Sequence, residues 1–199
     1  EILAKSPQHR KRVAWELPVA HLEPIARRCR ERGVEFSCTP FYLEAVKELE
    51  PYAAFYKVAS YELLWSDLLK ACAATGKPVI ISTGMAIMPE IKTAVATLEK
   101  AGARDITVLH CVSAYPSPAE QSNLSAIETI RKETGAKVGW SDHSRSGGDR
   151  ACGPSFRVYA GSRRASSMHT GPGPWSVAPS SRPMACAGTV KSMASRCHV

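Results

Sequence analysis

The sequence repeats one pattern five times, and this repeat constrains the fold more than any other feature. In each copy a short apolar run ends in a cluster of small polar or charged residues, and a helical stretch follows. The runs and their clusters occupy residues 34–41, 55–62, 79–85, 106–116 and 137–143. Nearly continuous apolar strands joined by helical crossovers are typical of parallel sheets that are covered on both faces. The repeat therefore predicts an α/β protein built from about five parallel βα units.

Helical periodicity fills the intervals between the apolar runs. It is clearest over residues 87–101, where four apolar side chains recur at helical spacing: Ile87, Ile91, Val95 and Leu98. Segments 63–74 and 122–134 show the same pattern, and a first helix is predicted from about Glu16 to Arg32. We expect these helices to cover the sheet.

The number of strands falls short of a closed barrel. The 199 residues suffice for one domain with a sizeable core, whereas a (β/α)8 barrel needs eight strands. The sequence also begins at Glu1, without an initiator methionine. We therefore expect residues 1–145 to form an incomplete (β/α)8, or TIM-type, barrel domain that is an internal slice of a larger one.

The composition changes abruptly after His143. Residues 144–199 contain no Leu, Ile or Glu, and they hold eight basic residues against one acid, Asp149. Such a segment cannot offset the entropy lost on ordering. We expect residues 146–199 to be an irregular, low-complexity basic tail, either disordered or translated out of frame. Because its arginines are scattered rather than clustered, we predict no nucleic-acid partner.

The cysteines and the apolar runs indicate the compartment. None of the seven cysteines forms a C-x-x-C pair, and the sequence shows no signal peptide. No apolar run approaches the roughly 18 residues of a membrane span. These features predict a cytoplasmic protein without disulfides, structural zinc or a membrane-spanning segment.

The polar clusters at the strand ends supply the candidate chemistry. They offer hydroxyl groups and one ammonium group, on Thr39, Lys57, Ser60, Ser82, Thr83 and Ser141. Together with the backbone amides at Thr83 and Gly84, these groups suit a phosphate or a similar anion. Taken alone, a single Ser or Thr at such a place is more typical of a helix N-cap, and Lys57 is alternatively a surface lysine at a strand end.

The titratable residues near these ends have two interpretations each. His143, which follows Ser141 and Asp142, is the best metal candidate, because neutral imidazole is a common ligand; the alternative is a hydrogen-bonded structural histidine. His110 lies inside an apolar run and is expected to be buried and hydrogen-bonded. Glu62 would orient a sugar hydroxyl or act as an acid at a helix N-terminus.

Five of these segments together resemble a known family. Residues 36–41, 56–60, 76–85, 109–116 and 141–143 occur in the order and spacing of the sialic acid synthase family, that of N-acetylneuraminate synthase. The resemblance covers roughly residues 16–145. It implies a (β/α)8 barrel transferase of sialic acid biosynthesis.

The resemblance also implies a reaction and a site. The family condenses phosphoenolpyruvate with N-acetylmannosamine or a related amino sugar, releases phosphate, and uses a divalent metal, Mn2+ or Mg2+. By motif, the phosphoenolpyruvate pocket would be lined by Thr39, Lys57, Ser60, Ser82, Ser113 and Ser141. Glu62 and Tyr115 would face the amino sugar, and His143 would be one of two histidine metal ligands. Glu62 and His143 are accordingly the catalytic candidates, and full-length relatives are expected to be homodimers.

The sequence departs from the family pattern in several places. Tyr61 stands where the family has Gly, and the family's opening strands, second metal-binding histidine and C-terminal domain have no counterpart. One alternative is therefore an inactive truncated fragment of such a synthase. Another is a pyruvate aldolase that uses Lys57 to form a Schiff base.

Overall fold

A single five-stranded sheet organises the molecule, and four of its strands are parallel. The structure is a computed structural model, which describes residues 6–7, 17–144 and 155–159. In chain order the strands are β1 (Tyr56–Val58), β2 (Val79–Ser82), β3 (Ile106–Cys111), β4 (Lys137–Asp142) and β5 (Ser155–Tyr159). Each strand pairs with the next; β1 to β4 run parallel, and β5 pairs antiparallel with β4. The carboxyl ends of β1 to β4 therefore meet at one edge of the sheet.

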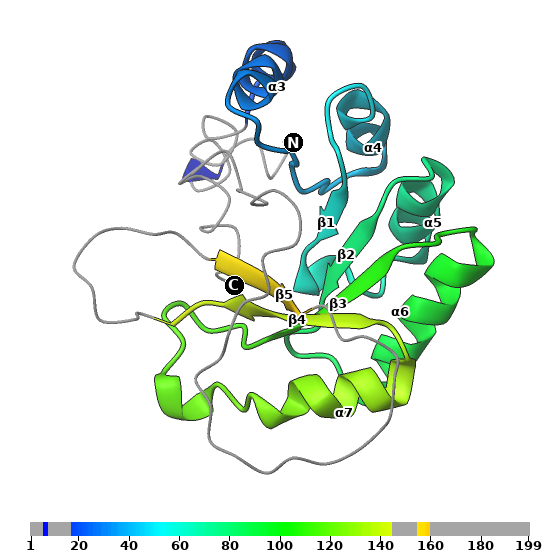
Figure 1. The fold of residues 1–199 in the computed structure, drawn as a ribbon, viewed down its shortest axis with the longest axis vertical. Helices are drawn as coiled ribbons and strands as arrows, with labels where there is room; N and C mark the ends of the chain where they lie inside the picture. The colour runs from blue at the N-terminus through cyan, green and yellow to red at the C-terminus, as the bar shows by residue number, and fades with distance from the viewer. Residues whose placement is uncertain (1–5, 8–16, 145–154, 160–199) are drawn as a thin grey trace.

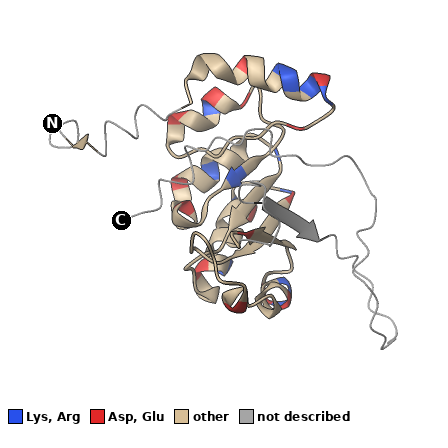
Figure 2. Ribbon diagram, turned by 90° about the vertical axis from the view of Figure 1, so that its left-hand side faces the viewer, with Lys and Arg blue, Asp and Glu red and all other residues tan. Residues whose placement is uncertain are grey.

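Helices connect the parallel strands. The described helices are η1 (Val19–His21), α3 (Leu22–Glu31), α4 (Leu43–Leu49), η2 (Ser60–Glu62), α5 (Ser66–Ala74), α6 (Met88–Lys100), η3 (Ala119–Gln121) and α7 (Ser125–Thr134). Figure 1 shows α4 to α7 arranged in an arc along one side of the sheet, as the crossovers of parallel strands require. Figure 2 shows that the charged residues lie mostly on the helices rather than on the strands.

The two faces of the sheet are buried differently. On the helix-covered face, strand residues such as Val58, Ile81 and Val108 pack with helix residues such as Leu69 and Leu98 into one large core cluster. On the opposite face a small separate cluster contains only three buried residues, Phe55, Ile80 and Leu109. Alternation along each strand assigns successive side chains to these two faces.

The polar strand-end residues follow this second face. Lys57, Ser82 and Cys111 each lie two positions after a member of the small cluster, so they share its face. Ser141 pairs in register with Cys111 on the neighbouring strand. The face that a closed barrel turns inward thus ends in polar side chains.

The predicted α/β fold class is confirmed, with two corrections to its elements. Segment 34–41 forms no strand, so the described sheet has four parallel strands rather than five. A backbone hydrogen bond from Ala54 N to Phe36 O at 2.8 Å and a side-chain bond from Ser37 to Phe55 O hold it near the sheet. No ladder forms, and Pro40 within this segment has no N–H group to donate.

The second correction concerns the tail predicted to be irregular. Residues 155–159 form β5, and their sequence, Ser-Phe-Arg-Val-Tyr, contains aromatic and β-branched residues that favour strands even without Leu or Ile. The remainder of the tail, and with it the expectation of disorder or a changed reading frame, lies outside the described residues. None of the helices within the described ranges is both long and apolar enough to cross a membrane.

Candidate active site

The ends of β1, β2 and β3 converge on Gly84. The amide of Gly84, just after β2, donates a hydrogen bond to Ser60 Oγ at 3.0 Å, which joins the second strand end to the first. Ser113 and Cys111, from the third strand end, border the same glycine. Three consecutive βα units therefore present hydroxyl, thiol and amide groups within contact of one another.

Two of the predicted hydroxyls are buried on the inward face. Ser82 is completely buried, and its Oγ has no hydrogen-bond partner among the described residues. Ser141 is also buried. A buried hydroxyl without a partner costs stability. A ligand that formed a hydrogen bond with Ser82 would remove this cost. Thr83 differs, because its hydroxyl donates to Leu109 O at 3.1 Å and so ties β2 to β3.

Charged groups border this cluster. Burial raises the pKa of the half-buried Glu62, and its backbone hydrogen bond together with the positive charge of Lys57 offsets only part of that rise. Glu62 Oε2 is buried without a hydrogen-bond partner in the described part of the chain. Lys57, itself half-buried, thus lies close enough to act on this carboxyl group. The site combines one cation with a carboxyl group whose charged form is disfavoured.

Cys111 connects the hydroxyl cluster with His143. Burial alone would raise the pKa of the Cys111 thiol, but hydrogen bonds with His143 and Ser60 and the charge of Lys57 lower that pKa below its ordinary value. The Cys111 Sγ atom lies 3.8 Å from His143 Nδ1. The sequence interpretation offered the Gly84 amide as a donor to the anion itself, whereas in the structure this amide donates to Ser60 Oγ. It did not include Cys111 as a site residue. For Cys111 the signal was present, since it alternates with Leu109 on the inward face.

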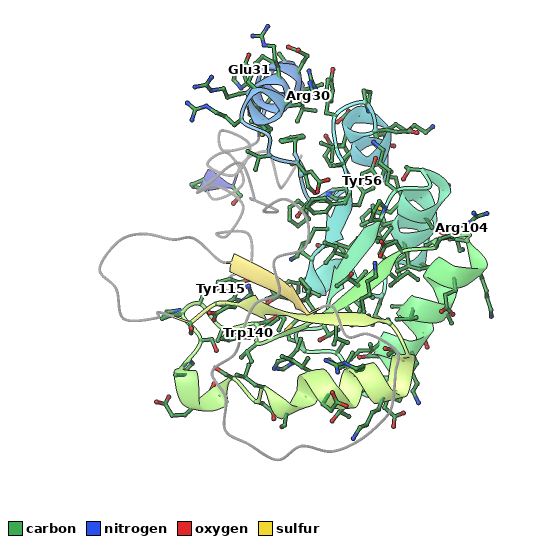
Figure 3. The ribbon with its side chains drawn as sticks, viewed as in Figure 1. Arg30, Glu31, Tyr56, Arg104, Tyr115 and Trp140 are labelled. Carbon is green, nitrogen blue, oxygen red and sulfur yellow. The ribbon has the colours of Figure 1, made fainter. Side chains whose placement is uncertain are left out.

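His143 is held in a single tautomer by its neighbours. Its Nδ1 lies 2.9 Å from Val112 O, and since a carbonyl group only accepts, Nδ1 carries the proton. The lone pair is then on Nε2, 3.3 Å from the hydroxyl of Tyr115, whose ring stacks on the imidazole with centroids 4.2 Å apart. Tyr115 lies at the carboxyl-terminal edge of the sheet, and Arg104 marks the opposite edge (Figure 3).

In this tautomer His143 could act as one metal ligand, but the described residues do not form a complete metal site. The Nε2 lone pair is what a divalent cation would bind in place of the Tyr115 hydroxyl, and the Nδ1 bond to a carbonyl group is the usual outer support. However, the described residues contain no group of three or more His, Cys, Asp or Glu side chains placed to hold a metal ion. From the part of the chain that the structure describes, His143 is the ligand that such an ion would find at these strand ends.

Two other predicted residues lie apart from the cluster. Thr39 is half-buried in segment 34–41, outside the sheet. His110 is buried, as expected, and its Nε2 bonds to Ser122 O at 2.7 Å. His110 also borders a cavity of about 390 Å³ on the helix-covered face, whose lining includes Thr83, Met88, Ile91, Asn123 and Ile130. Cys111 borders both this cavity and the polar strand-end cluster, and the cluster holds the other candidate residues of the active site.

The fold and the site define a parallel α/β protein of the barrel type with a polar site at its strand ends. The model of the NeuB family matches residues 3–152, and the chain belongs to this family. The match ends a few residues beyond position 145, where the resemblance noted in the sequence was placed.

Individual relatives agree with this assignment. The chain is 46% identical to an uncharacterized protein of Methanocaldococcus jannaschii over 56% of its length and 34% of the relative's. It is 39% identical to pseudaminic acid synthase of Helicobacter pylori over 53% of its length and 32% of the relative's. The crystal structure of N-acetylneuraminic acid (sialic acid) synthetase from Leptospira borgpetersenii, in complex with citrate, superposes with a TM-score of 0.62 at 34% identity, covering 65% of this chain and 45% of that one. The chain thus spans about a third of the length of the curated relatives it matches.

Proposed function

We propose that this chain carries the phosphoenolpyruvate-binding part of a synthase that condenses phosphoenolpyruvate with N-acetylmannosamine or a related amino sugar. The products would be a sialic acid, or a close nine-carbon relative, and phosphate. The observation that carries the proposal is the convergence of Ser60, Ser113 and the Gly84 amide, with Lys57 and the unpartnered hydroxyl of Ser82 on the adjoining strands. Fixed donors and one cation are what a phosphate or carboxylate group requires.

The residues would act by binding and orientation. Lys57 would neutralise an anionic group of phosphoenolpyruvate, and the strand-end hydroxyls, including Ser141, would orient it. Carbon 3 of phosphoenolpyruvate would then form a bond to the aldehyde carbon of the open-chain sugar with the electron pair of the C2–C3 double bond. The carbonyl electron pair would move to the aldehyde oxygen, which takes a proton that the attacking water finally supplies. Water adds at carbon 2, and the carbon–oxygen bond to phosphate breaks, so the phosphate leaves with the bridging oxygen. Holding the two reactants in this orientation would lower the activation free energy of the reaction, and it requires no covalent intermediate on the protein.

Glu62 and Tyr115 would face the amino sugar. The Glu62 carboxyl group has a raised pKa and a buried oxygen without a hydrogen-bond partner among the described residues. A sugar hydroxyl would supply that partner when the substrate binds. His143 Nε2 would help to hold a divalent cation, Mn2+ or Mg2+, which supplies Lewis-acid polarisation of the sugar carbonyl. Full-length copies are proposed to form homodimers and to work in the cytoplasm.

The test is phosphate release by the full-length protein. With a divalent metal present, phosphoenolpyruvate should release phosphate only when N-acetylmannosamine or a related amino sugar is added. Absence of sugar-dependent release across such a panel would refute the proposal. Borohydride trapping of a substrate adduct on Lys57, with activity that survives a chelator, would instead support a Schiff-base aldolase.

A matched pair of serine variants sharpens this test. Ser82→Ala should weaken phosphoenolpyruvate binding by about 10- to 100-fold, the value of one hydrogen bond to a charged group. Its melting temperature should not fall, because the variant removes a buried hydroxyl that has no partner among the described residues. The exposed Ser66→Ala variant, on α5, should change neither quantity. Unchanged binding in Ser82→Ala would remove this serine from the site.

A further inference from the structure

Space, not backbone geometry, favours glycine at position 84, because any Cβ there would force the neighbouring serine side chains to move. Its φ lies outside the left-handed region that favours glycine, so other residues could adopt its backbone conformation. A Cβ atom at this position, however, would lie 2.1 Å from Ser113 Oγ, 2.9 Å from Ser60 Oγ and 3.3 Å from Cys111 Sγ. The first two distances are shorter than carbon–oxygen contacts in folded proteins allow.

The missing Cβ lets the backbone enter the polar cluster. The Gly84 amide reaches Ser60 Oγ at 3.0 Å, and an accepting hydroxyl keeps its single proton to donate elsewhere. Ser60 thereby becomes an oriented donor rather than a freely rotating one, and its single proton goes either to the neighbouring Cys111 sulfur or to a bound anion. Ser113 occupies the volume beside Gly84 that any side chain would take.

We propose that Gly84 is the positioning residue of this site: its bare backbone lets the end of β2 close against the ends of β1 and β3, so that Ser60 and Ser113 bind one anionic group of the same ligand. The inference rests on the proposed function for the identity of that ligand, phosphoenolpyruvate. Gly84 itself acts through the two serines, and through its amide on Ser60.

The first experiment separates positioning from general damage. In the full-length protein, Gly84→Ala should raise the KM for phosphoenolpyruvate by about 10- to 100-fold, because a displaced serine loses a hydrogen bond to a charged group. The KM for the amino sugar should change little. The control is Gly76→Ala at the amino end of β2, where φ is +72° and no atom lies within 4 Å of the added Cβ. This control is destabilised by backbone strain, yet its KM values should equal those of the wild type.

The second experiment is a double-variant cycle with Ser113→Ala. Removal of the Ser113 hydroxyl relieves the shortest contact, so Gly84→Ala should lower the melting temperature much less in the Ser113→Ala background than in the wild type. Additive losses of melting temperature, or a wild-type KM for phosphoenolpyruvate in Gly84→Ala, would overturn the inference. If the wild type neither binds phosphoenolpyruvate nor releases phosphate, the proposed function fails, and additivity in the melting cycle then decides the inference about Gly84.

Discussion

At the scale of single residues, the candidate site keeps polar groups that the fold alone does not satisfy. Glu62 Oε2 and Ser82 Oγ are the two buried side-chain oxygens without a hydrogen-bond partner among the described residues, and both belong to the strand-end cluster. A protein selected for stability alone would pair or remove such groups. Their presence at this edge is consistent with a ligand that completes their hydrogen bonds.

The Glu62→Gln variant tests, through the pH dependence of the melting temperature, whether the buried carboxyl group of Glu62 costs stability when it is charged. Burial raises the pKa of Glu62 in the folded protein, so the folded state binds more protons than the unfolded state once the pH exceeds the ordinary glutamate pKa. The contribution of Glu62 to stability therefore falls as the pH rises from that ordinary value through the folded pKa. We expect Glu62→Gln to melt at a higher temperature than the wild type at neutral pH, with the difference vanishing in acid.

The control for this titration is the exposed Glu99 on α6, whose Glu99→Gln variant should follow the wild-type dependence of melting temperature on pH. If the melting temperatures of the wild type and of Glu62→Gln changed with pH in parallel, burial would not disfavour the charged form of Glu62.

At the scale of elements, the loop between β3 and α7 is fastened at three points. His143 Nδ1 binds Val112 O at its start, and Ser117 N donates to His143 O at 2.9 Å in its middle. His110 binds Ser122 O near its end. Because the loop carries Ser113 and Tyr115, His110 on β3 and His143 directly after β4 help to hold the backbone that bears these side chains.

His110→Ala should loosen the far end of this loop. The variant leaves Ser122 O without its partner and removes a buried ring, so we expect a loss of about 2–4 kcal/mol in the free energy of unfolding. Hydrogen exchange of the amides in residues 112–124 should accelerate beyond that of β3. His110→Gln keeps a donor near the position of Nε2 and should restore part of the protection. Equal exchange in the wild type and in His110→Ala would show that His110 does not hold the loop.

At the scale of the whole molecule, the described chain supplies one side of a barrel-type site. Its four parallel strands bring the carboxyl ends of β1 to β4 together, and their inward face carries the candidate residues. The same strands contribute a single imidazole, that of His143, towards a metal site, and the described residues include no cluster of three ligands. The described residues therefore offer more groups to the proposed anion than to the proposed metal.

We expect the 199-residue chain to bind Mn2+ no more tightly than its His143→Ala variant. Manganese is held weakly by nitrogen and oxygen ligands, and the single imidazole that the described residues offer at the strand ends does not overcome this. Calorimetric titration of the two proteins with Mn2+ should give superimposable curves, and neither should show synthase turnover. A tight site that depends on His143 would mean that other residues, such as His169 in the tail, complete the coordination.

The sequence by itself determined the fold class, and it predicted most residues of the candidate site. Apolar runs of strand length and helices with 3.6-residue periodicity predict a parallel α/β sheet, because buried strands and amphipathic helices leave different local patterns. The small polar residues that follow each run predicted Lys57, Ser60 and Ser82 together, since the ends of parallel strands meet at one edge. These inferences needed only local pattern and chain order.

Tertiary structure alone decided how these residues meet. Segment 34–41 has a strand-like sequence but forms no ladder, because strand pairing depends on backbone partners that lie far along the chain. The bond of Gly84 with Ser60 and the contact of Cys111 with His143 join residues 24 and 32 positions apart. No local pattern encodes such contacts; they arise because hydrogen bonds between strands align the βα units edge to edge and bring their carboxyl ends within a few ångströms of one another.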